Sequence, residues 1–68
     1  MKKKLTINGE NTFVLSETLL KVLNEINIIK NQNMAVAVNE EVIEKINWEN
    51  YKIKSGDIIE IVQPLKGG

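Results

Sequence analysis

The sequence of 68 residues contains no cysteine and no histidine. Without cysteine there can be no disulfide framework, no thiolate nucleophile and no cysteine-ligated metal. Without histidine the chain lacks the side chain whose ordinary pKa suits acid–base catalysis near neutral pH. A metal site would need carboxylates alone, so we predict no metal site, no catalytic side chains and no bound cofactor. These absences argue against a self-contained enzyme.

Arginine is also absent, since lysine supplies all nine basic residues, and nine acidic residues balance them. The chain therefore has no net field to attract nucleic acid or anionic lipid, and no guanidinium group for two-point phosphate contacts. The longest apolar run, residues 34–38, is too short for a membrane span or a signal-peptide core. We predict a cytoplasmic domain that works through a partner and binds neither nucleic acid nor membrane.

The first part of the chain, residues 4–15, has the pattern of a β-hairpin that turns at Asn8-Gly9. Alternating apolar residues mark its two strands: Leu5 and Ile7, then Phe13 and Leu15. A two-residue turn would place these pairs on opposite faces, so we predict a bulge or a three-residue loop that brings them together.

An amphipathic helix should follow, with Ser16 as its N-cap and Glu17 at the positive end of its dipole. Its apolar stripe has helical spacing and consists of Leu19, Val22, Leu23 and Ile26. The polar residues 30–33 predict a loop, with Ile28 and Ile29 tucked beneath it.

The next segment predicts a second hairpin that turns at Asn39-Glu40 and is followed by an irregular crossover. Its first strand would turn one side toward the core, with Met34, Val36 and Val38, and its second would lie around Val42 and Ile43. The crossover would be anchored by Ile46, Trp48, Tyr51 and Ile53. We interpret Trp48 as a core side chain and not as a recognition surface.

After a turn at residues 55–57, the stretch 58–62 carries apolar residues on both faces, as a central strand does. Pairing should fail near Pro64, which has no N–H to donate. One helix would then cover one face of a mixed sheet of four or five strands. The prediction is an α+β fold of the ubiquitin-like β-grasp type, with residues 1–63 as the domain and 64–68 as a flexible tail.

The composition of the tail suits an extended segment that enters a partner's active site. Pro64 would stiffen its exit, Leu65 and Lys66 would lie in a groove, and Gly67 and Gly68 would pass a slot too narrow for side chains. Five extended residues reach roughly 16–18 Å. The α-carboxylate of Gly68 is the one reactive group that a chain without cysteine or histidine offers there.

This carboxylate is ionised at neutral pH and can attack the α-phosphate of ATP in a partner enzyme, with pyrophosphate leaving. The acyl-adenylate could accept sulfur and yield a thiocarboxylate, or accept an amine and yield an isopeptide-linked modifier. The tail residues alone do not choose between these outcomes.

Residues 35–68 resemble the thiamine-biosynthesis sulfur carrier proteins, the ThiS family. The matching features are the Val-Ala-Val-Asn strand and turn that ends at Asn39, the tryptophan Trp48, the Gly56-Asp57 turn and the final Gly67-Gly68. Residues 4–10 are similar to the opening of the family. Glu40 departs from it, because members often carry glycine or glutamine after this asparagine.

The resemblance implies that Gly68 is adenylated by a ubiquitin-activating-like adenylyltransferase, which uses ATP, and is then converted to a thiocarboxylate. Sulfur would come from a donor such as a cysteine desulfurase and pass to thiazole synthase. The chain would be a cosubstrate. Three alternatives stay open: the small subunit of molybdopterin synthase, a ubiquitin-like modifier, and a plain β-grasp binding module.

Overall fold

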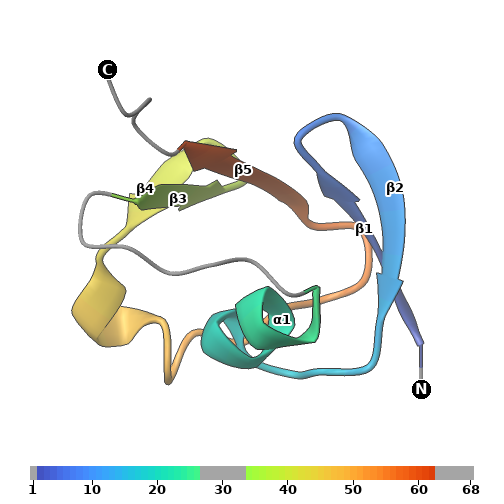
Figure 1. Cartoon of the computed structure of the whole chain (residues 1–68), viewed down its shortest axis with the longest axis horizontal. Helices are drawn as coiled ribbons and strands as arrows, with labels where there is room; N and C mark the ends of the chain where they lie inside the picture. Colours follow the sequence, from blue (N-terminus) through green and yellow to red (C-terminus); the bar gives the residue numbers. More distant parts are fainter. Residues whose placement is uncertain (1, 27–33, 63–68) are drawn as a thin grey trace, which may run out of the picture.

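The computed structural model of the chain describes residues 2–26 and 34–62. It contains a five-stranded sheet in the order β2-β1-β5-β3-β4. The central pair β1 and β5 is parallel, and the neighbouring pairs are antiparallel. The helix α1 covers one face of this sheet, as Figure 1 shows. The predicted β-grasp fold is confirmed. The elements are β1 (Lys3–Ile7), β2 (Glu10–Val14), α1 (Leu19–Glu25), β3 (Ala35–Val38), β4 (Glu41–Ile43), the 3₁₀-helix η1 (Lys45–Asn47) and β5 (Ile58–Val62).

The first hairpin turns where the sequence predicts, but its geometry is tighter. Asn8 and Gly9 have φ values of 51° and 84°, and Ile7 pairs directly with Glu10. Positive φ values at both turn residues, with direct pairing of the flanking residues, are typical of a two-residue turn whose twist matches that of the strands. Such a turn needs no bulge. The predicted bulge is therefore wrong. Phe13 and Leu15 are 60% and 63% exposed, on the face away from the core.

The helix begins later than predicted, because Thr18 and not Ser16 is its N-cap. The Thr18 hydroxyl accepts a hydrogen bond from the Lys21 N–H at 3.4 Å. Upstream of the cap the chain pairs with the crossover: the Ile53 N–H donates to the Glu17 carbonyl at 2.8 Å. This pairing and the bridge between Thr18 and Lys52 keep the chain before Leu19 out of the helix, so Glu17 lies outside the first helical turn. The predicted apolar stripe is buried at Leu19, Val22 and Leu23, while Ile26 is partly buried against the core.

The second hairpin and the crossover follow the prediction with one exception. Asn39 and Glu40 form the turn with φ values of 52° and 71°. Trp48 is 1% exposed, and its Nε1–H donates to the Ile43 carbonyl at 2.8 Å, so its core role is confirmed. Ile46 is not an anchor, because it is 80% exposed on η1. The residues that anchor the crossover are Trp48, Ile53 and, in part, Tyr51.

The strand β5 lies at the centre of the sheet, between β1 and β3, as the sequence predicts. Ile59 is fully buried and Ile61 packs on the core, whereas Ile58 and Val62 are 50% and 62% exposed on the opposite face. A β-strand alternates its side chains between the two faces. Only one face of the described sheet is covered by α1, so the second apolar row of β5 is left exposed.

The core lies between the sheet and α1. It is formed by Leu5, Ile7, Val14, Leu19, Val22, Leu23, Met34, Val36, Val38, Ile43, Trp48, Ile53 and Ile59. Among the described residues, neither helix has the length and hydrophobicity needed to cross a membrane. The predictions for Ile28, Ile29 and the loop 30–33 concern residues outside those described, as does the boundary between domain and tail at residue 63.

Candidate functional site

The predicted reactive segment follows directly on the central strand of the sheet. Pro64, Leu65, Lys66, Gly67 and Gly68 lie outside the described residues, so their predicted roles stay predictions. The structure describes the element from which they continue, since β5 ends at Val62. β5 is paired with β1 at Ile58 and Ile59 and with β3 as far as Val62, so β3 holds the strand up to its last residue.

The start of β5 is held by a network around Asn39. The Asn39 N–H donates to the Ile58 carbonyl at 2.7 Å, and its Oδ1 accepts from the Ile58 N–H at 3.0 Å. Its Nδ2 donates to Asp57 Oδ1 at 3.1 Å, while Asp57 Oδ2 accepts from the Lys54 N–H at 2.8 Å. The second hairpin and the turn before β5 are thus tied together. The sequence predicted both turns but gave no indication of these side-chain bonds.

The sheet face opposite α1 carries a group of exposed apolar side chains, which we call the open face. Its most exposed members are Phe13, Val42, Ile58 and Val62. The small side chains of Ala35 and Ala37 lie between them in the strand register, with Ala35 beside Val62 and Ala37 beside Val42. Exposed apolar groups gathered on one surface are typical of a protein–protein interface.

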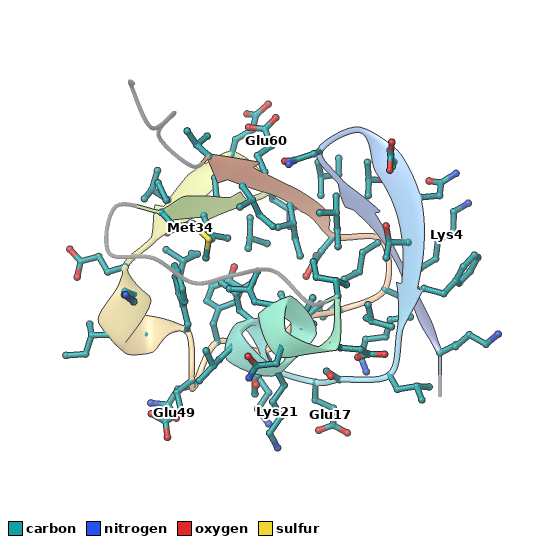
Figure 2. All side chains as sticks on the ribbon, in the orientation of Figure 1. Lys4, Glu17, Lys21, Met34, Glu49 and Glu60 are labelled. Carbon is teal, nitrogen blue, oxygen red and sulfur yellow. The ribbon has the colours of Figure 1, made fainter. Side chains whose placement is uncertain are left out.

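Charged side chains of both signs lie among these apolar groups. Figure 2 shows Glu60 pointing away from α1; Glu60 pairs with Ala37 and lies between Ile58 and Val62 along β5. Lys4 pairs with Phe13, and the Lys2 Nζ lies 5.7 Å from the centre of the Phe13 ring. The open face is therefore a mixed surface of apolar and charged side chains. The sequence alone did not identify the residues of this surface, although the apolar residues on both faces of β5 were a signal for it.

The helical side of the molecule offers a hollow of about 450 Å³ near η1. It is lined by Leu20, Lys45, Ile46, Trp48 and Glu49. Among the described residues that line it, Lys45 and Glu49 are the ionisable groups, and the Trp48 indole N–H is already bonded to the Ile43 carbonyl. Across residues 2–26 and 34–62, no group of three or more acidic, histidine or cysteine residues could hold a metal ion. The described part of the chain thus presents an exposed apolar sheet face and this hollow as its main surface features.

The comparison with protein families matches residues 4–68 to the ThiS family, so the match takes in both the described domain and the tail. The chain belongs to the ThiS family. A crystal structure of a ThiS thiamine biosynthesis protein from Geobacter metallireducens is 25% identical, with a TM-score of 0.80 over 96% of this chain and 99% of that one. No curated protein matches the chain.

An NMR solution structure of a thiamine biosynthesis protein from Geobacter metallireducens is also similar to this ThiS-family chain. It has 25% sequence identity and a TM-score of 0.76, and the likeness covers 96% of this chain and 87% of that chain. The family and these structures support a sulfur carrier in thiamine biosynthesis. They also suggest that a ThiS-type chain is a carrier acted on by enzymes and not an enzyme itself.

Proposed function

We propose that this chain carries sulfur as a thiocarboxylate on Gly68 and delivers it to thiazole synthase for the thiazole ring of thiamine. The observation that carries this proposal is the ThiS-family match, which extends through residue 68 and so includes the Gly67-Gly68 tail. The structure supports it with a rigid central strand, β5, that leads into the tail, and an open face beside that strand.

The chemistry needs only the main-chain carboxylate of the carrier. One carboxylate oxygen of Gly68 attacks the α-phosphorus of ATP, and pyrophosphate leaves with the electrons of the broken bond. Sulfide attacks the acyl carbon, AMP leaves, and the thiocarboxylate forms directly. If the nucleophile is the persulfide of a cysteine desulfurase, the product is an acyl disulfide, and a thiol reductant must cleave its S–S bond to release the thiocarboxylate. Sulfur held on a protein arm has a high effective concentration in the next active site and is not released as free sulfide.

The partners in this proposal are a ubiquitin-activating-like adenylyltransferase, which supplies the ATP site, a sulfur donor such as a cysteine desulfurase, and thiazole synthase. The chain itself would bind no cofactor. Pro64, Leu65, Lys66 and Gly67 would thread the partner's active site, where glycine fits a channel too narrow for side chains. We propose a cytoplasmic location, where these partners would meet the carrier.

The open face is the surface that we propose for docking. Val62 lies on this face at the end of β5, two positions before the first tail residue, Pro64. A partner that draws the tail into its active site must approach this end of the strand. It would cover the exposed apolar side chains around Val62, and their burial would contribute to affinity.

Incubation with ATP, the adenylyltransferase and a sulfur donor tests the proposal. The intact mass of the chain should shift by the difference between sulfur and oxygen, and fragmentation should place the change on Gly68. A variant without Gly68 and a variant with one residue added after it should both fold and show no shift. If the extended variant restored thiamine-independent growth without being trimmed back to Gly68, the proposal would be wrong.

Complementation separates this function from the alternatives. The gene should restore growth without thiamine in a strain that lacks its own thiamine sulfur carrier. It should not restore the activity of a molybdenum enzyme in a strain without the small subunit of molybdopterin synthase. A modifier would instead produce conjugates of higher mass that survive denaturation and reductant.

A further inference from the structure

Asn8, in the first hairpin, is hydrogen-bonded to the end of β5 through both ends of its side-chain amide. Its Oδ1 accepts from the Ile61 N–H at 2.7 Å, and its Nδ2 donates to the Ile61 carbonyl at 3.3 Å. The Asn8 main-chain N–H also donates to the Ile59 carbonyl at 2.9 Å. One turn residue thus makes three hydrogen bonds to the strand that precedes the tail.

These bonds occur where β5 has lost its strand partner on one side. The parallel pairing of β1 with β5 covers only Thr6 with Ile58 and Ile7 with Ile59, because β1 then turns. On the other side β3 continues to pair with β5 as far as Val62. A carboxamide has the same donor and acceptor as a peptide group, so the Asn8 side chain replaces the missing residue of β1.

The backbone of Asn8 makes this arrangement possible. Its φ of 51° lies in the left-handed region, which asparagine tolerates better than most residues. Glycine tolerates this conformation as well but has no amide to offer. A change to glycine would therefore remove the side-chain bonds and keep the turn.

We infer that Asn8 is a positioning residue for the sulfur-carrying tail, an inference that rests on the proposed function. Asn8 holds Ile61 on one side of β5, while β3 pairs with the strand on the other side as far as Val62. Without the Asn8 contact, Ile61 and Val62 would be held by β3 alone and would fray more often; each frayed residue adds roughly 3.3–3.6 Å of reach to the segment that follows. The partner would then have to order those residues each time it binds the carrier.

Asn39 provides a matched control at the opposite end of β5. It too is the first residue after a strand, with a φ of 52°, and its Oδ1 accepts from a β5 main-chain N–H, that of Ile58. Asn39→Gly removes a similar set of bonds from the start of the strand and should leave the root of the tail in place. If lower folding stability alone raised KM, Asn8→Gly and Asn39→Gly should therefore both raise it.

The experiment compares wild type, Asn8→Gly, Asn8→Asp and Asn39→Gly. Hydrogen exchange should show the Ile61 amide of Asn8→Gly exchanging at least about tenfold faster relative to the Ile59 amide. With the adenylyltransferase, KM for the carrier should rise roughly five- to thirtyfold with kcat unchanged, which corresponds to ordering one further residue. Asn8→Asp keeps the acceptor for the Ile61 N–H and should recover most of the wild-type KM. Asn39→Gly should keep the wild-type KM and the Ile61-to-Ile59 exchange ratio.

Three results would overturn the inference. In the first, Asn8→Gly frees the Ile61 amide yet keeps the wild-type KM, which leaves the proposed function intact. In the second, Asn8→Gly and Asn39→Gly raise KM equally, as a purely structural role predicts. In the third, the wild-type chain is not adenylated at all, and then the proposed function fails together with the inference.

Discussion

Replacing Val62 with threonine tests the docking role of the open face with almost no change in shape. Val62 is 62% exposed, so a partner that covers it would bury about three-fifths of its side chain. For a whole valine side chain, that burial is worth about 0.9 kcal/mol, and threonine, which keeps one of the two methyl groups, loses about half of it. The threonine hydroxyl adds a desolvation cost of about 1–3 kcal/mol if it finds no hydrogen-bond partner in the interface. The sum is about 1.5 kcal/mol at the lower end, or roughly a tenfold weaker complex.

The assay is the affinity of the carrier for the adenylyltransferase, measured by calorimetry at fixed salt. Ile46→Thr is the matched control, because Ile46 is 80% exposed on η1, on the helical side of the molecule. Both substitutions are at exposed positions and should change folding stability by no more than about 0.5 kcal/mol. If Val62→Thr bound like wild type, or if Ile46→Thr weakened binding equally, the assignment of docking to the open face would be refuted.

Three further predictions concern the fold. Glu40 has a φ of 71°, so Glu40→Gly should raise stability by about 1 kcal/mol, whereas Glu40→Ala should not, as urea denaturation would show. Trp48→Phe leaves the buried Ile43 carbonyl without its donor and should cost at least about 2 kcal/mol, seen as a lower Tm by circular dichroism. The Ser16 hydroxyl and nearby main-chain N–H groups lower the pKa of Glu25 below its ordinary 4.5. That stabilisation is present above pH 4.5 and is lost as the pH falls through the lower folded value, so the gap in urea midpoint between wild type and Glu25→Gln should close in acid.

Local patterns in the sequence predicted the elements of the fold well. The Asn8-Gly9 and Asn39-Glu40 turns are where they were expected, since asparagine and glycine tolerate the positive φ values that such turns need. The helical stripe around Val22 and the central place of β5 are also confirmed. These predictions succeeded because turn chemistry and hydrophobic period act over a few residues.

Other predictions failed where contacts between residues far apart in the chain determine the start of the helix or the burial of a side chain. Ser16 and Thr18 are both good N-caps by type, but pairing of the chain at residue 17 with Ile53 places the helix start at Thr18. Ile46 and Trp48 are both large and apolar, yet only Trp48 reaches the core, where the Ile43 carbonyl takes its N–H. The apolar pattern of the crossover did not distinguish these two positions.

In the candidate site, too, the sequence predicted the features that depend on neighbouring residues and not those that depend on distant contacts. The sequence indicated the tail and its glycines, because the reactive group belongs to the main chain and needs no folded neighbours to be recognised. It did not identify the residues of the open face, because these depend on which side of the five-stranded sheet α1 covers. Nor did it indicate the Asn8 amide on Ile61, a contact between residues 53 apart in the chain.

Residue order alone thus settled the positions of the turns, the period of each strand and the chemistry available at the tail, since all three depend on neighbouring residues. Tertiary structure decided which apolar side chains are buried, which form the open face and what holds the end of β5. Those outcomes depend on the order of strands in the sheet, and that order is set by the packing of the whole domain around one small core.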